Sequence, residues 1–376
     1  MPPTMAKIVA EFEKYFTTER RGMPTIAKGL GITEATLRTR VREAYAQGAI
    51  QFRVPRNDAL AQHLGKEWPD VGYFVLDSEA ELFDRGAAEV FFEEMRQLLH
   101  DWDNEDRPLR IGVVSGRTTG GMIEAICNSP KPWAELMPMD RLPKKTCVYA
   151  LNVSQTDGYP HLKGNANVLA FELARRLSKE IRAREYAEER EVEAYGLSAA
   201  LLQNREEAMR TDCGPQVQIV LRDTDPGRLR ESMEALGREV HPDLPPESQL
   251  DVVITGAGSI RDSLFTKYST QNSFDVDAMS RELHVVGDIA YNPVTRTGDL
   301  VVLTDEDGKE CVFYSAISLT VLSEMSKNRL KRVMLVARGR NKIDPIFAAI
   351  APEKPLCSVL ITDVETARNL RDKFRA

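Results

Sequence analysis

The chain has 376 residues, a length that suits two or three domains. Its residues are 42% hydrophobic and 28% charged, a composition typical of globular proteins. Its formal charge of -7 excludes a polycation that coats nucleic acid. The sequence contains no run of 18 apolar residues, so we predict no membrane span. Residues 1–60 nevertheless carry ten Lys/Arg against six Asp/Glu, so a basic head precedes an acidic body. This asymmetry predicts a small nucleic-acid-binding domain attached to a larger one.

Residues 1–21 lack the apolar core of a signal peptide, and the five cysteines are scattered. The sequence contains no CxxC pair and no Cys/His cluster with the spacing of a zinc site. These features predict a cytoplasmic protein with reduced thiols, no metal, no cofactor and no membrane attachment.

The head predicts three short helices. Residues 4–17 place apolar side chains on one helical face. A second helix opens near Pro24 and ends at Gly31, and Thr33 can cap a third helix. Residues 49–54 alternate in the manner of a strand and predict a wing. A tight glycine turn before the last helix is typical of a helix-turn-helix.

The exposed face of the third predicted helix combines small polar side chains with arginines. Threonines can contact base edges or phosphates, and arginines can pair with guanine or neutralise phosphates. A head that packs against a protein partner is the alternative. The predicted DNA-contacting residues are Thr33, Thr36, Arg38, Thr39, Arg40 and Arg42.

The body repeats one pattern, in which a short apolar strand is followed by a polar or glycine-containing loop and then a helix. Predicted strands cover residues 72–76, 109–114, 251–255, 333–337 and 358–362, and a strong amphipathic helix covers residues 87–99. This alternation predicts an α/β fold with a doubly wound, mostly parallel sheet covered on both faces. Ligands bind such sheets at the carboxyl ends of the strands.

The loop at residues 115–121 combines glycines, three hydroxyls and one arginine directly before a helix, which suits an anion. An ordinary strand-to-helix turn is the alternative, because the order of a Walker loop is absent. A later loop brings Arg338, Arg340 and Lys342 to the same expected edge, where cations favour a phosphate. Residues 256–258 begin a dinucleotide fingerprint but lack its third glycine, which argues against NAD or FAD.

The order of these segments resembles the SorC family of sugar-binding bacterial transcription regulators. The resemblance spans about residues 6–370. It rests on the head at residues 26–50 and on body stretches 111–119, 162–167, 251–258, 286–288 and 339–342, continuing to 360–367. It implies a body similar in fold to sugar-phosphate isomerases and CoA transferases, used as a sensor. It also implies assembly into dimers or tetramers on long operators.

The resemblance further implies an effector site. The family's threonine pair and late lysine hold a phosphate, its acidic residue accepts sugar hydroxyls, and polar residues line the same pocket. The implied effector-binding residues are Ser115, Gly116, Thr118, Thr119, Asn152, Asn165, Asp288 and Lys342. Arg117 and Arg338 depart from the family pattern and are expected to add charge or bulk at the mouth of the pocket.

Residues 180–245 are longer than the family's usual connection. They contain a charged helical run at 182–190, expected as a solvated face or an arm between subunits, and a candidate strand-helix unit at 217–236.

Together these features predict a DNA-binding domain at residues 1–56 and an effector and oligomerisation domain at residues 57–376. The expected partners are double-stranded operator DNA, a small effector such as a phosphorylated sugar, and further copies of the chain. The alternative is a sugar-phosphate isomerase-like or transferase-like enzyme with an accessory head. Asp288 and Lys342 are its only plausible catalytic pair, so we predict no catalytic set.

Overall fold

The computed structural model describes most of the head and the body. The described residues are 3–14, 22–46, 54–77, 80–152, 165–183, 190–196, 202–204, 250–261, 276–301, 303–304, 310–313, 315, 317–351 and 353–375. The predicted strand-helix unit at 217–236 and most of the charged run at 182–190 therefore lie outside the described residues.

The described part of the head consists of three helices, α1 (Met5–Glu13), α2 (Met23–Leu30) and α3 (Glu34–Ala46). Gly31 ends α2 with a φ of 67°, a left-handed conformation that glycine adopts without steric cost. The three-helix prediction is confirmed, whereas the expected wing at 49–54 lies outside the described residues except for Val54. The small core of the head comprises Ile8, Phe12, Met23, Ile26, Ala27, Leu37, Val41 and Ala44.

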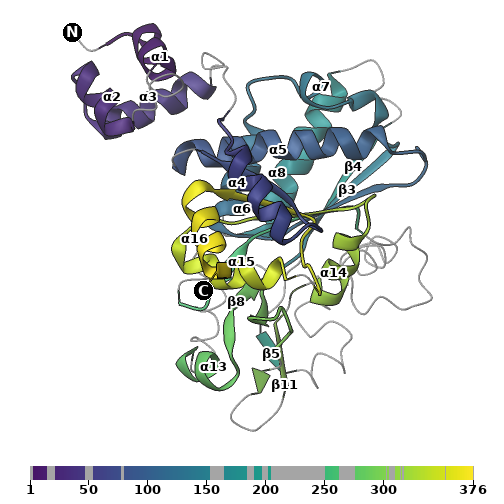
Figure 1. Cartoon of the computed structure of the whole chain (residues 1–376). Coiled ribbons are helices and arrows are strands. Elements are labelled where there is room, and N and C mark those ends of the chain that lie inside the picture. The colour runs from purple at the N-terminus through teal and green to yellow at the C-terminus, as the bar shows by residue number, and fades with distance from the viewer. Residues whose placement is uncertain are drawn as a thin grey trace.

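The segment at residues 54–57 connects the head to the body. The Asn57 N–H donates to the carbonyl of Val75 at 2.8 Å, and the Asp77 N–H donates to the carbonyl of Pro55 at 2.8 Å. Figure 1 shows the three head helices beyond the amino-terminal end of the long body helix α5 (Ala80–His100).

A seven-stranded parallel sheet forms the centre of the body, with the strand order β1-β13-β12-β6-β2-β3-β4. From β2 the chain continues outward to β3 and β4, and from β6 it continues in the opposite direction to β12 and β13. The winding therefore reverses between β2 and β6, which confirms the doubly wound prediction. The strands are β1 (Gly72–Leu76), β2 (Leu109–Val113), β3 (Lys145–Ala150), β4 (Glu191–Tyr195), β6 (Val252–Thr255), β12 (Arg332–Val336) and β13 (Val359–Asp363).

Helices cover both faces of this sheet (Figure 1). One layer contains α5, α6 (Arg117–Cys127) and α8 (Ala166–Arg182), and the other contains α4 (Asp58–Glu67), α14 (Leu319–Lys327), α15 (Ile343–Ala349) and α16 (Val364–Arg375). Strand side chains alternate between the two cores. In β12, Met334 and Val336 pack toward α5, and Val333 and Leu335 pack toward α14 and α15.

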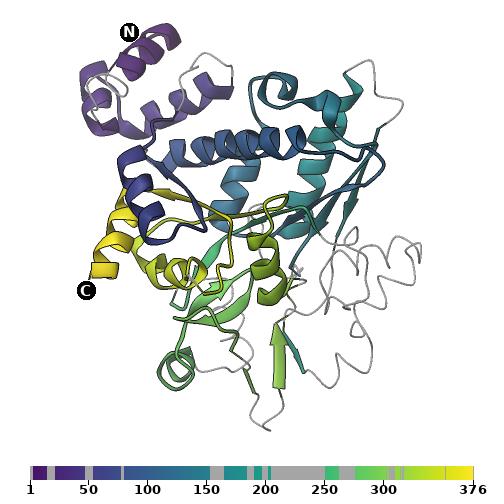
Figure 2. The same cartoon turned by 45° about the vertical axis from the view of Figure 1, so that its right-hand side comes forward.

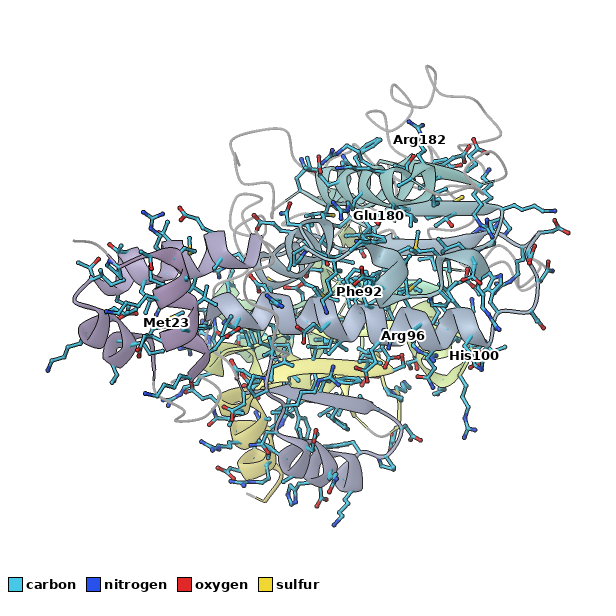
Figure 3. The ribbon with its side chains drawn as sticks, turned by 90° about the horizontal axis from the view of Figure 1, so that it is seen from above. Met23, Phe92, Arg96, His100, Glu180 and Arg182 are labelled. Carbon is cyan, nitrogen blue, oxygen red and sulfur yellow. The ribbon has the colours of Figure 1, made fainter. Side chains whose placement is uncertain are left out.

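Short elements complete the layer that contains α5. Figure 3 shows this layer from above, with Phe92, Arg96 and His100 on α5 and Glu180 and Arg182 on α8. Between these helices lie α7 (Trp133–Leu136) and the 3-10 turn η2 (Met139–Arg141). Trp133 packs edge-on against Phe92 with ring centroids 5.3 Å apart, and the backbone N–H of Trp133 donates to Oε2 of Glu180 at 3.0 Å.

Two small antiparallel sheets extend the body away from the head in Figure 2. One contains β7 (Ala257–Ser259), β8 (Val285–Ile289) and β9 (Asn292–Thr295), and α13 (Val276–Glu282) lies between β7 and β8 in the chain. The other contains β10 (Leu303–Thr304), β11 (Glu310–Phe313) and β5 (Leu202–Asn204). None of the helices in the described ranges has both the length and the hydropathy that a membrane crossing requires.

Candidate functional site

The loops that follow β2, β6 and β12 meet at the point where the winding of the sheet reverses. Gly116 precedes α6, and a Cβ built on Gly116 would lie 3.2 Å from Oγ1 of Thr119. A Cβ built on Gly256, after β6, would lie 3.0 Å from the same oxygen. Lys342, at the end of the turn η6 (Arg340–Lys342) after β12, donates from Nζ to Oγ1 of Thr118 at 3.4 Å. Strand order thus brings together residues that are far apart in the sequence.

The amino-terminal turn of α6 offers donors without acceptors. Thr119 is fully buried, and its Oγ1 has no hydrogen-bond partner among the described residues. Gly116 has no side chain that could cap the helix, and the first N–H groups of a helix have no intrahelical acceptor. These groups and the helix dipole create a positive potential. The loop predicted to bind an anion therefore combines a glycine backbone with a buried hydroxyl.

Ser115 links this turn to two other elements. Its N–H donates to Oδ1 of Asn152 at 2.8 Å, and Nδ2 of Asn152 donates to Oγ of Ser115 at 2.9 Å. The same Oγ lies 2.9 Å from the hydroxyl of Tyr291. The N–H of Tyr291 in turn donates to Oδ2 of Asp288 at 3.2 Å. The structure therefore connects Ser115, Asn152 and Asp288 through one buried polar network.

Tyr291 is absent from the residues that the sequence pointed to. It lies three positions after Asp288, in the turn between β8 and β9, and it is only 4% exposed. The one available signal was its closeness to the Val-Gly-Asp stretch at residues 286–288. Nothing local in the sequence places a tyrosine hydroxyl on a serine 176 positions earlier.

Asn165 has a structural role in the described residues. Its side-chain oxygen accepts a hydrogen bond from the N–H of Val168 at 3.2 Å and caps α8. A role for Asn165 in binding stays a prediction.

The three cations of the later loop do not converge. The guanidinium of Arg338 lies over the ring of Phe83 in α5, 4.9 Å from its centroid. Nε of Arg340 pairs with Oε1 of Glu365 at 2.5 Å on the surface. Of the three, only Lys342 contacts the threonines. The expectation that Arg338 adds charge or bulk at the mouth of the pocket stays a prediction, and the aromatic face of Phe83 gives its guanidinium a favourable contact.

The glycines at the end of the predicted loop also have another role. Gly120 and Gly121 lie inside α6, and a Cβ on Gly121 would lie 2.2 Å from Oδ2 of Asp84. Gly121 therefore permits close packing of α6 against α5 and belongs to the scaffold of the site.

The threonines of the head occupy the start and the exposed face of α3. The hydroxyl of Thr33 accepts a hydrogen bond from the N–H of Thr36 at 3.1 Å, so Thr33 caps the helix as predicted. Thr36 and Thr39 are exposed, and Thr39 donates from its hydroxyl to the carbonyl of Ala35 at 3.1 Å. Both hydroxyls can turn to an external acceptor.

The arginines of α3 are paired with carboxylates of the same helix. Arg38 is half-buried and forms an ion pair with Glu34, whereas Arg40 is exposed and contacts Oε2 of Glu43 at 2.7 Å. The side chain of Arg42 lies outside the described residues. Exposed ion pairs contribute little stability, so Arg40 can exchange its carboxylate for a phosphate at small cost.

Within the described ranges, no group of three or more His, Cys, Asp or Glu side chains is arranged to hold a metal ion.

Comparisons with known proteins bear on the fold. No family model matches the sequence, and no curated protein matches it. Solved structures do match. The full-length sorbitol operon regulator SorC from Klebsiella pneumoniae has a TM-score of 0.56 at 16% identity, covering 98% of this chain and 99% of that chain. A transcriptional regulator from Streptococcus pneumoniae TIGR4 has a TM-score of 0.52 at 16% identity, covering 85% and 98%.

A DeoR family transcriptional regulator from Listeria monocytogenes has a TM-score of 0.51 at 16% identity, covering 83% of this chain and 98% of that chain. At these identities the likeness establishes a shared fold. The match to the Klebsiella protein spans nearly the whole chain, so the expected order of a helix-turn-helix head followed by an α/β body is confirmed as a fold.

Proposed function

We propose that this chain is a cytoplasmic transcription regulator whose affinity for DNA is controlled by a phosphorylated sugar. The head, residues 1–56, binds double-stranded operator DNA, and the body, residues 57–376, binds the effector and assembles into dimers or tetramers. One observation carries the proposal. The buried, unpartnered hydroxyl of Thr119 lies at the start of α6, beside the contact between Lys342 and Thr118. The fold shared with SorC, a sorbitol operon regulator by its description, supports the same reading.

The chemistry of the donors favours a phosphate ester over an uncharged sugar. A phosphate offers acceptor oxygens to the N–H groups of α6, to the hydroxyl of Thr119 and to the ammonium of Lys342. Ser115, Asn152 and Asp288 lie on the adjoining side and can exchange hydrogen bonds with hydroxyls of the carbon chain. The ester thus lies across the place between β2 and β6 where the winding of the sheet reverses.

Control of DNA binding requires that the ester bind one arrangement of the body better than another. In an oligomer, that preference changes the separation of the heads, and operator half-sites are matched only at the correct separation.

The binding site is tested by isothermal titration calorimetry with inorganic phosphate and a panel of sugar phosphates. Lys342→Ala should weaken binding of every phosphorylated ligand by about tenfold or more, because a charge-assisted hydrogen bond contributes about 1.5–3 kcal/mol. Arg340→Ala is the matched control, since Arg340 lies two residues away and pairs with Glu365. Equal affinities for the wild type and Lys342→Ala would contradict the proposed site.

The enzyme alternative depends on Asp288 and Lys342. In the structure the carboxylate of Asp288 accepts the N–H of Tyr291, and the ammonium of Lys342 contacts Thr118, so both have positioning contacts. Turnover of a sugar phosphate that is lost in Asp288→Asn would favour the enzyme.

A further inference from the structure

The turn between β8 and β9 has an unusual backbone. Ile289 and Asn292 are paired across the hairpin, so Ala290 and Tyr291 are its two central residues. Their φ angles are 50° and 64°, both in the left-handed region. A two-residue hairpin with two positive φ angles strongly favours Gly, Asn or Asp at these positions. An alanine and a tyrosine there are strained, and the surrounding structure must hold them.

The contacts that hold the turn are polar and buried. Oδ2 of Asp288 accepts the N–H of Tyr291, and Nδ2 of Asn292 donates to the carbonyl of Ile317 at 2.9 Å and to that of Ile289 at 3.2 Å. At its far end, Tyr291 contacts the Oγ of Ser115 at 2.9 Å. These contacts therefore offset the backbone strain and keep one aromatic side chain directed at the end of β2.

The phenol of Tyr291 lies between Ser115 and Asp288, two of the residues that the proposed effector would contact. Its hydroxyl is at Ser115, beside the anion-binding start of α6, and its backbone N–H is at Asp288. A carbon chain that extends from a phosphate on Thr119 toward Asp288 meets this ring, which is 4% exposed. A glycine in the same backbone conformation would be unstrained and would leave this space open.

We infer that Tyr291 is a specificity-determining residue that limits the length of the effector. This inference rests on the proposed function, since it concerns the same phosphate site. With Tyr291 in place, the site takes short phosphate esters such as glycerol 3-phosphate in preference to hexose phosphates. The buried polar contacts of the turn hold a bulky side chain at a position suited to glycine, although the backbone there is strained.

The test is a ratio of affinities. Calorimetry with the full chain gives the Kd of glycerol 3-phosphate, of fructose 6-phosphate and of inorganic phosphate. In Tyr291→Gly, we expect the preference for fructose 6-phosphate over glycerol 3-phosphate to rise at least tenfold, while the Kd of inorganic phosphate changes less than threefold. Tyr291→Asn, whose side chain also tolerates the left-handed region, should show the same shift and replaces the glycine variant if that variant fails to fold.

Tyr291→Phe is the matched control, because it removes the hydroxyl contact with Ser115 and keeps the ring. Its preference should remain within threefold of the wild type. If inorganic phosphate binds and the ratio of the two esters is unchanged in both small variants, the length limit is wrong and the phosphate site stands. If neither the wild type nor the variants bind inorganic phosphate or either ester, the proposed phosphate site is wrong and the inference fails with it.

Discussion

The hydroxyl of Thr119 is expected to have opposite effects on ligand affinity and on the stability of the fold. A fully buried hydroxyl without an acceptor or donor partner costs free energy in the folded protein, about 1–3 kcal/mol. Such a cost is tolerated where the hydroxyl serves a ligand. The same hydroxyl lies against Gly116 and Gly256, where a Cβ would crowd it. Both positions therefore suit glycine because the oxygen of Thr119 lies so close.

Replacing Thr119 by valine keeps the shape of the side chain and removes this hydroxyl. We expect Thr119→Val to leave the free energy of unfolding unchanged or higher, since an unsatisfied polar group is removed. Its affinity for inorganic phosphate should fall by about three- to tenfold, the worth of one hydrogen bond. Urea unfolding and calorimetry measure the two effects.

Thr146→Val is the matched control, because Thr146 also carries a buried Oγ1 without a partner among the described residues but lies in β3, outside the site. It should not alter phosphate binding. A loss of more than 2 kcal/mol in unfolding free energy for Thr119→Val would show that its hydroxyl has a structural role.

Lys331 is a second residue whose environment has a measurable consequence. Its ammonium donates to the carbonyl of Leu250 at the amino ends of the strands, opposite the candidate site. Burial is the main cause that lowers the pKa of Lys331 to about 8; Asp251 opposes this shift, and Arg107 and Arg110 add to it. Between pH 8 and about 10.5 the unfolded chain therefore binds more protons at this position than the folded chain.

Stability must rise with pH across that window, because the cost of burying the charged ammonium disappears as it is deprotonated. In Lys331→Met this contribution is absent. The gain in unfolding free energy between pH 7.5 and 9.5 should therefore be smaller in the variant than in the wild type. Urea titrations at several pH values measure it, with the exposed Lys66→Met as the control. An identical pH profile for Lys331→Met and the wild type would contradict the lowered pKa.

At the scale of elements, α3 is the part of the head suited to the major groove. Its exposed side carries Thr36, Thr39 and Arg40, while Leu37 and Val41 fix the opposite side in the core of the head. Arg40 can leave Glu43 for a DNA phosphate because the pair is exposed on both sides. The polar side of α3 can therefore contact DNA while its apolar side stays packed in the core of the head.

Arg40→Ala should weaken binding to a duplex of random sequence and reduce the slope of log affinity against log salt by about one unit. Fluorescence anisotropy at several salt concentrations measures both. Lys66→Ala, which removes the same charge from α4 of the body, should leave the slope unchanged. If the two variants bind DNA alike at every salt concentration, α3 is not the DNA-contacting helix.

For the whole molecule, the proposed function links two sites on separate parts of the chain. Any factor by which the effector changes the affinity for DNA must equal the factor by which DNA changes the affinity for the effector. The link between them runs through residues 54–57, which are hydrogen-bonded to β1 and its following residue.

This reciprocity can be measured with an operator selected from random duplexes. The Kd of the best phosphate ester, with and without saturating operator, should change by the same factor as the Kd of the operator with and without the ester. Lys342→Ala should bind the operator as the free wild type does and lose the response to the ester. An ester that binds the wild type tightly but leaves its affinity for the operator unchanged would contradict effector control.

The sequence by itself determined the local elements. Helix and strand periodicity and glycine placement are local properties. The three head helices, the strands β1, β2, β6, β12 and β13, and the positions of Ser115, Thr118, Thr119 and Lys342 in the loops and helix starts that follow strands were therefore predicted from the residues near each of them. The resemblance supplied Asn152 and Asp288. In the structure Asn152 hydrogen-bonds Ser115 directly, and Asp288 is connected to Ser115 through Tyr291.

Only the tertiary structure decided which strand ends meet. Placing β6 between β2 and β12 brings Gly256 against Thr119 and Lys342 against Thr118, and no local pattern specifies that order. The same holds for the contact between Arg338 and Phe83, because no local pattern specifies it. Contacts between residues far apart in sequence depend on how complete elements pack, so a strained turn could bring Tyr291 to Ser115 without any sign near either residue.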